Sequence, residues 1–149
     1  MTAQHSARPP VIRITKLLPA TPEDVFAAWT DPESLKAWMC PEATSVAAAT
    51  LDLRVGGKFR IVMRGENSEI VHVGEYRDIC PPERLVFTWQ SAATLQQETL
   101  VTVELFPRGQ QTELVLTHEL FPDGHSAAQH QSGWQSLVEK LDRFLRIGQ

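Results

Sequence analysis

The histidines are the residues of this sequence whose type points to the most specific chemistry, namely metal binding or proton transfer. The five are His5, His72, His118, His125 and His130. His125 and His130 are five residues apart, so on a helix they would point about 140° away from each other. The sequence holds neither a His-Glu-x-x-His motif nor a Cys/His knuckle. We therefore expect neither a metal site nor a cofactor.

Two of the histidines, His118 and His130, fall on rows of otherwise apolar residues that should face the protein interior. Each could be a hydrogen-bonded core residue, or a polar group that lines a cavity and orients a ligand or moves a proton. Tyr76 is a third candidate for the same role. The residue types leave both interpretations open.

Nucleophilic catalysis finds little support in the sequence. There is no Gly-x-Ser-x-Gly elbow. Cys40 and Cys80 are two lone cysteines, which we interpret as reduced structural thiols, with a disulfide between them as the alternative. Glu104 and Glu113 fall on polar rows, which indicates a solvated face. We assign no catalytic residue, and a binding role is favoured over an enzymatic one.

The elements that must position these residues belong to a chain of 149 residues, a length that suits one domain. The formal net charge of −4 argues against a nucleic-acid or anionic-membrane surface. No apolar run is long enough for a membrane span, and the first ten residues lack the apolar stretch of a signal peptide. We expect a cytoplasmic protein with a disordered tail over residues 1–10 and a single domain over residues 11–149.

Three helices are predicted. A capping residue followed by proline occurs at Thr21-Pro22 and again at Asp31-Pro32, which predicts short helices over residues 22–29 and 32–38. The third helix should run from Ser126 to Ile147, with Ser126-x-x-Gln129 as a capping box. Its apolar stripe steps by four and three residues. The stripe consists of His130, Trp134, Leu137, Leu141 and Phe144.

Between the short helices and the long one, the sequence predicts a meander of strands. A first strand over residues 11–18 precedes the short helices, and the meander runs from about Ser45 to Leu120. Clean alternation of apolar and polar residues marks most of it, whereas residues 69–79 show none. The predicted inner rows are Leu51, Leu53 and Val55; Phe59, Ile61 and Met63; Leu85, Phe87 and Trp89; Val101, Val103 and Leu105; and Leu114, Leu116, His118 and Leu120.

The expected fold is therefore α+β, with a curved antiparallel sheet of about seven strands around a long C-terminal helix. One helix cannot fill the concave side of such a sheet, so a hollow is predicted between them. Gly133 would either let the helix approach a strand closely or leave room for a ligand. The predicted ligand-binding residues, which could also be ordinary core, are Trp38, Phe59, Met63, Tyr76, Trp89, His118, His130, Trp134 and Leu137.

Four segments in the right order resemble one family. They are residues 26–38 (Phe-x-x-Trp-Thr-Asp-Pro-Glu), 52–59 (Asp-Leu-Arg-Val-Gly-Gly), 74–89 (Gly-x-Tyr through Thr-Trp) and 130–137 (His-x-x-Gly-Trp). Together they resemble the family named after the activator of the heat-shock protein 90 ATPase. That family is part of the SRPBCC superfamily, with START and birch-pollen-allergen proteins, and the resemblance implies a helix-grip fold.

The resemblance leaves the activity open. The family's namesake is a co-chaperone domain, while relatives in the superfamily bind lipids, hormones or polyketides, and some are cyclases or hydrolases. The leading hypothesis is a binding module for a small hydrophobic or aromatic molecule. The alternatives are a chaperone-regulating interaction protein and a cyclase or hydrolase that uses a cavity histidine. We expect a monomer or a weak homodimer.

Overall fold

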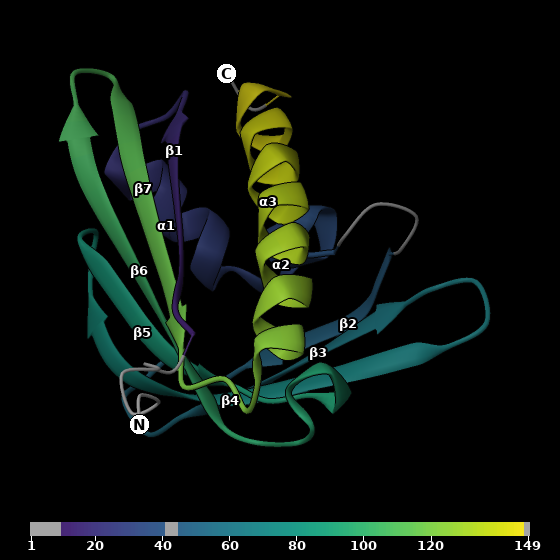
Figure 1. Ribbon diagram of the computed structural model, residues 1–149. Helices are drawn as coiled ribbons and strands as arrows, with labels where there is room; N and C mark the ends of the chain where they lie inside the picture. Colours follow the sequence, from purple (N-terminus) through teal and green to yellow (C-terminus); the bar gives the residue numbers. More distant parts are fainter. Residues whose placement is uncertain (1–9, 41–44, 148–149) are drawn as a thin grey trace, which may run out of the picture.

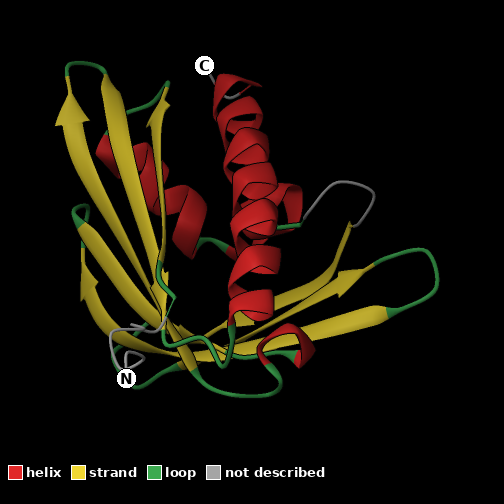
Figure 2. Ribbon diagram, viewed as in Figure 1, coloured by secondary structure: helices red, strands yellow, loops and turns green. Residues whose placement is uncertain are grey.

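The computed structural model describes residues 10–40 and 45–147, and its elements follow the predicted order (Figures 1 and 2). The strands are β1 Ile12–Leu18, β2 Ser45–Leu51, β3 Lys58–Arg64, β4 Glu69–Cys80, β5 Arg84–Trp89, β6 Thr99–Arg108 and β7 Gln111–Glu119. The helices are α1 Pro22–Thr30, α2 Pro32–Trp38, the 3₁₀ helix η2 Ala92–Thr94 and α3 Gly124–Ile147. Residues 1–9 of the predicted tail lie outside the described residues.

The seven strands form one antiparallel sheet in the order β1-β7-β6-β5-β4-β3-β2. The sheet curves around α3, and the hairpin of β3 and β4 extends past the helix (Figure 1). The helix contacts β1, α2 and η2. This arrangement is the predicted α+β helix-grip fold, with one long helix on the concave face.

Strand β4 lies between β3 and β5, so it joins the β2–β3 part of the sheet to the part formed by β5, β6, β7 and β1. It bends where these two parts meet. Its pairing with β5 shifts register between Tyr76 and Asp78. At Gly74, a Cβ atom would lie 2.0 Å from the carbonyl oxygen of Thr88 and 2.4 Å from the ring of Phe59. Only glycine allows this close approach, so Gly74 is a structural requirement of the bend.

Both short helices begin as predicted. Thr21 Oγ1 accepts a hydrogen bond from the Asp24 amide at 3.4 Å, and Asp31 Oδ2 accepts one from the Ser34 amide at 2.9 Å. Proline occupies the first position of each helix, where its missing N–H leaves no bond unmade.

The predicted capping box of the long helix is wrong. Helix α3 begins at Gly124, and Asp123 Oδ1 accepts the hydrogen bond from the Ser126 amide at 2.8 Å. The hydroxyl of Ser126 instead donates to the carbonyl oxygen of Ala93 at 2.6 Å, which ties the start of α3 to η2. The Ser-x-x-Gln pattern is present in the sequence, but the aspartate three residues earlier caps the helix. The predicted glycine cap at position 148 lies outside the described residues.

The core forms between the inner rows of the sheet, the two short helices and α3. The inner rows of β3, β5 and β6 are buried as expected. The large apolar residues of α1 and α2 are buried too, namely Val25, Phe26, Trp29, Leu35 and Trp38. Two inner rows end earlier than predicted. Leu53 and Val55 are 42% and 60% exposed, because β2 ends at Leu51 and the chain turns at Asp52. Leu120 is 56% exposed at a φ of 69°, so the backbone reverses and Phe121 takes the buried place.

Within residues 10–40 and 45–147, no helix combines the length and apolar character needed to cross a bilayer.

Candidate functional site

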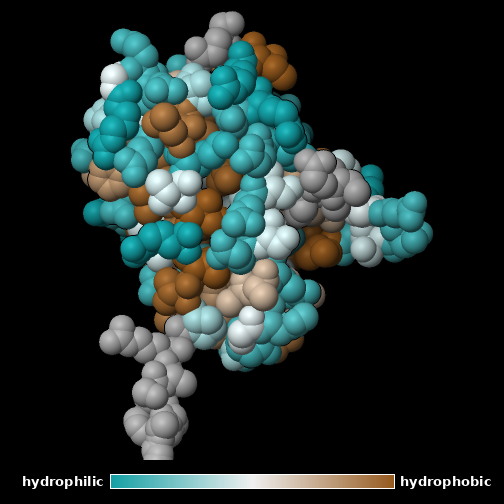
Figure 3. Space-filling model, turned by 45° about the horizontal axis from the view of Figure 1, so that its top comes forward, coloured by the Kyte–Doolittle hydropathy of each residue, from teal (hydrophilic) through white to brown (hydrophobic). Residues whose placement is uncertain are grey.

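A cavity of about 340 Å³ lies between α3 and the β3–β4 hairpin. Its lining is mostly apolar, and residues of β3, β4, β5, η2 and α3 contribute to it. The lining residues are Met63, Gly65, Ser68, Ile70, His72, Trp89, Ala93, Gln129, His130, Gly133, Trp134 and Leu137. Viewed as in Figure 3, brown apolar atoms are exposed at the base of the hairpin. Pockets of this size and character typically bind small molecules.

Gly133 keeps the cavity open from the helix side. A Cβ atom built on this residue would meet no atom within 4 Å. The hypothesis that Gly133 allows close approach of the helix to a strand is therefore wrong, because nothing approaches it. The alternative, that the glycine leaves room beside the helix, agrees with this geometry.

Three neighbouring aromatic rings form the inner wall of the cavity. The ring of His72 lies 4.7 Å from that of Trp89, and Trp89 lies 5.3 Å from Trp134, measured between centroids. Tilted aromatic pairs at these separations are favourable beyond their burial. The wall joins β4, β5 and α3, so the sheet and the helix are fixed to each other at this point.

His118 supports the wall from behind and does not line the cavity. Its side chain is 0% exposed. Trp134 Nε1–H donates to His118 Nδ1 at 3.0 Å, so the proton of the neutral ring must be on Nε2. That nitrogen lies 2.7 Å from Thr99 Oγ1, and the Thr99 hydroxyl donates in turn to the carbonyl oxygen of Trp89. Both nitrogens are thus committed, and the residue is a hydrogen-bonded core histidine that orients Trp134.

His130 has the opposite arrangement. Its Nδ1 lies 2.8 Å from the carbonyl oxygen of Ser126, which can only accept, so the proton of the neutral ring is on Nδ1. Nε2 then carries a lone pair and has no hydrogen-bond partner among the described residues. The ring packs against His118 and Phe121, and the residue borders the cavity.

Burial keeps all three histidines of this region neutral. Burial, with a smaller contribution from His130, lowers the pKa of His118 to about 2. Burial and then His130 lower the pKa of His72 to about 4, although the carbonyls of Ile61 and Ile70 act in the opposite direction. Burial also lowers the pKa of His130, while its bond to the Ser126 carbonyl raises it. At neutral pH the rings therefore offer lone pairs and N–H groups without charge.

Two buried nitrogens of the wall have no hydrogen-bond partner among the described residues, namely Trp89 Nε1 and His72 Nδ1. The carbonyls near His72 do not reach hydrogen-bonding geometry with Nδ1. A buried polar atom left unpaired costs about 1–3 kcal/mol. The wall thus combines apolar surface with unused hydrogen-bonding capacity.

Of the nine predicted ligand-binding residues, five line this cavity: Met63, Trp89, His130, Trp134 and Leu137. The other four do not. Phe59 and Tyr76 border a separate void of about 20 Å³ deeper in the core, where burial raises the pKa of Tyr76 to about 12. Trp38 is fully buried, with Nε1 donating to the carbonyl oxygen of Ala28 at 3.1 Å, and His118 lies behind the wall.

His72 lines the cavity although it was not among the predicted ligand-binding residues. His72 faces Ile61 across the β3–β4 pair, and opposite residues of an antiparallel pair share one face. Folding residues 58–75 back on the turn at residues 65–68 would have placed His72 on the inner face. The signal was present in the register rather than in the alternation of β4 itself.

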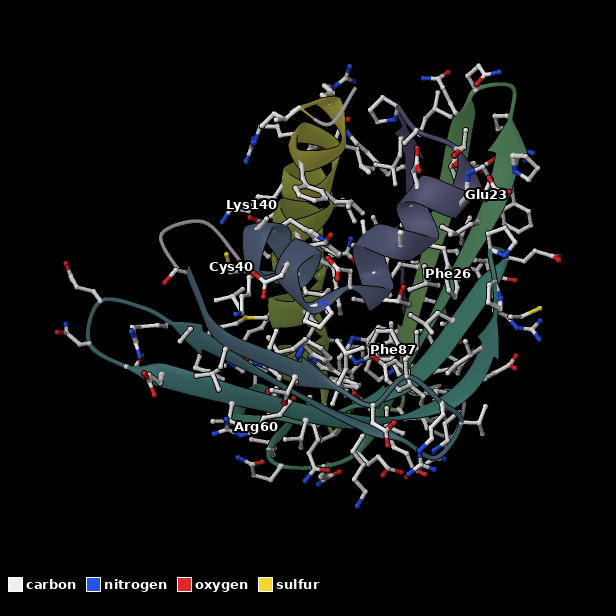
Figure 4. The ribbon with its side chains drawn as sticks, turned by 180° about the vertical axis from the view of Figure 1, so that it is seen from behind. Glu23, Phe26, Cys40, Arg60, Phe87 and Lys140 are labelled. Carbon is white, nitrogen blue, oxygen red and sulfur yellow. The ribbon has the colours of Figure 1, made fainter. Side chains whose placement is uncertain are left out.

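Other reactive groups of the described chain do not gather at the cavity. Both cysteines are free, and Cys40 Sγ accepts a hydrogen bond from Lys140 Nζ at 3.2 Å at the end of α2 (Figure 4). Within the described ranges no group of three or more His, Cys, Asp or Glu residues is placed to hold a metal ion.

Comparison with known proteins identifies a family whose sequence pattern this chain shares. The sequence model of the family described as "Activator of Hsp90 ATPase homolog 1-like protein" matches residues 19–146. A solved structure from Rhizobium loti is 30% identical, with a TM-score of 0.78, and the match covers 91% of this chain and 96% of that one. The AHSA1 protein of Silicibacter pomeroyi is 27% identical, with a TM-score of 0.82 and coverage of 94% and 100%.

CalU16 of Micromonospora echinospora is similar in fold, at 24% identity and a TM-score of 0.71, with coverage of 91% of this chain and 75% of that one. No curated protein matches the chain significantly.

Proposed function

We propose that this chain, which belongs to the family of activator of Hsp90 ATPase homolog 1-like proteins in the SRPBCC superfamily, binds a small, mostly apolar molecule between α3 and the β3–β4 hairpin. The observation that carries the proposal is the 340 Å³ cavity with an apolar lining and a glycine in its helical wall. An engineered cavity of about 150 Å³ already binds benzene in another protein. The space beside Gly133 therefore suffices for a larger molecule.

The energetics support useful affinity. Burying about 300 Å² of apolar ligand surface contributes about 7 kcal/mol before association costs. The rings of Trp89 and Trp134 are held by packing and by the His118 bond, so little side-chain entropy is lost on binding. A preformed wall of this kind suits a rigid, flat molecule.

The test fills the cavity from the helix side. Gly133→Leu places a side chain in the open space, whereas Gln135→Leu introduces the same leucine side chain on the exposed side of α3. We expect the amphipathic dye 1-anilinonaphthalene-8-sulfonate, through its aromatic part, to bind the unmodified chain and the Gln135→Leu control, and to lose binding in Gly133→Leu. Thermal melts establish that all three proteins are folded.

Equal dye binding by the three folded proteins would contradict the proposal. Native mass spectrometry of the freshly purified chain adds an independent measurement. A mass above that of the bare chain supports a retained ligand.

The family description also names the ATPase of heat-shock protein 90, which motivates the chaperone-regulating hypothesis. That hypothesis is tested by adding the chain to the purified chaperone and measuring ATP turnover. The Gly133→Leu variant separates the two roles, because a partner that binds the outer surface does not depend on the cavity.

A further inference from the structure

The lone pair on Nε2 of His130 is a polar feature of the cavity with a defined direction. Nδ1 is turned back to the helix backbone at Ser126, and Nε2 is on the other side of the ring, away from that backbone. His118 and Phe121 pack against the ring at centroid distances of 4.9 and 5.2 Å. These contacts fix the orientation of Nε2 before any ligand arrives.

Gly133 leaves the approach to that ring open. Residues three apart on a helix lie on the same face, so a side chain at position 133 would stand beside His130. The absent side chain would meet nothing within 4 Å, and both residues border the cavity. The pair His130-x-x-Gly133 therefore places an acceptor and an open space side by side on one face of α3.

Resting on the proposed function, we infer that the ligand carries a hydroxyl group, as a phenol does, that donates a hydrogen bond to Nε2 of His130. A neutral imidazole with Nδ1–H already donating offers only an acceptor at Nε2. An apolar ligand without a donor leaves that lone pair buried and unpaired, which lowers its affinity relative to a hydroxylated analogue. The ligand class is thus a small, mostly apolar molecule with a hydroxyl group, such as an aromatic alcohol, rather than a hydrocarbon or an ether.

The experiment compares 2-naphthol with 2-methoxynaphthalene by displacement of 1-anilinonaphthalene-8-sulfonate. Both probes present an aromatic bicycle and an oxygen acceptor, so the unpartnered Trp89 Nε1–H does not distinguish them. Only 2-naphthol donates a hydrogen bond. We expect the unmodified chain to bind 2-naphthol roughly 2–10-fold more tightly than the ether.

Two variants assign the preference to one residue. His130→Phe keeps a ring between His118 and Phe121 but removes the lone pair, so we expect both probes to bind it with equal affinity. His125→Phe makes the same substitution at an exposed position of α3 and should keep the preference. Equal affinities in the unmodified chain, or a preference that persists in His130→Phe, would overturn the inference and leave the proposed function standing. Failure of both probes to bind would overturn both.

A second measurement needs no variant. Long-range ¹H–¹⁵N correlation spectra report which nitrogen of each histidine carries the proton. We expect the Nδ1–H form for His130 and the Nε2–H form for His118, and a shift of the His130 Nε2 resonance with 2-naphthol but not with the ether. An Nε2–H form of His130, or an equal response to both probes, would refute the inference.

Discussion

Gly74 and Gly133 are glycines in opposite surroundings, so we expect alanine substitutions at the two positions to change the free energy of unfolding in opposite directions. At Gly74 a methyl group would overlap the Thr88 carbonyl and the Phe59 ring. We expect Gly74→Ala to lower the free energy of unfolding by about 3 kcal/mol, because neither the backbone nor the packed ring can move freely. Urea unfolding followed by tryptophan fluorescence measures this change. Neutral surface substitutions change the free energy of unfolding by about 0.5 kcal/mol or less. A loss no larger than that would contradict the close approach.

Gly133→Ala should have the reverse effect. Alanine is more favourable than glycine inside a helix by about 1 kcal/mol, and the added methyl meets nothing. We therefore expect the free energy of unfolding to rise by about 0.5–1 kcal/mol in the same urea assay. A loss of stability would mean that the space beside Gly133 is filled.

The histidines illustrate what residue types alone can predict. Their place on apolar rows indicated that His118 and His130 face inward, and both are buried. The difference between them depends on partners from distant segments. Thr99 on β6 and Trp134 on α3 occupy the nitrogens of His118, whereas His130 turns to Ser126 four residues earlier. No spacing in the sequence encodes the long-range pair.

At the scale of elements, the start of α3 gives a direct test of the corrected cap. Asp123→Ala removes the acceptor for the Ser126 amide and should lower the free energy of unfolding by about 1 kcal/mol. Gln129→Ala, which would break the predicted capping box, should change stability by less than about 0.5 kcal/mol. Thermal melts of the two variants compare them. A larger loss of stability for Gln129→Ala than for Asp123→Ala would support the predicted capping box instead.

Alternation predicted the strands that have one wet face and one buried face, such as β3, β5 and β6. It failed for β4, because this strand bends at Gly74 and its pairing with β5 shifts register between Tyr76 and Asp78. A strand of that kind does not keep one face toward one environment. The cavity residues of β4 were therefore hidden, although the hollow itself followed from one helix facing a large sheet.

For the whole molecule, the depressed pKa values of His72 and His118 predict a loss of stability in mild acid. In the unfolded chain both rings titrate near 6.5, while in the folded chain their pKa values are about 4 and about 2. Between these values the unfolded state binds more protons, so their contribution is complete above pH 6.5 and declines as the pH falls. We expect the free energy of unfolding to decrease by about 1.4 kcal/mol per pH unit for each ring.

Urea unfolding at several pH values between 6.5 and 5 measures this slope. The His72→Phe variant keeps a ring against Trp89 but removes one titrating group. It should therefore reduce the slope by about 1.4 kcal/mol per pH unit, the contribution of one proton. Stability that is constant over this range would show that the rings are accessible to protons in the folded chain.

The strand order also determines when each part of the sheet can form on the ribosome. From β2 to β7, every strand pairs with its neighbour along the chain, so each hairpin can close as soon as it has emerged. Strand β1 is different, because its only strand partner in the described sheet is β7, with Ile12 opposite His118. Strand β1, which is synthesised before the other six strands, is thus the last to find its place in the sheet. During translation β1 and its apolar residues stay unpaired until β7, about a hundred residues downstream, has been synthesised.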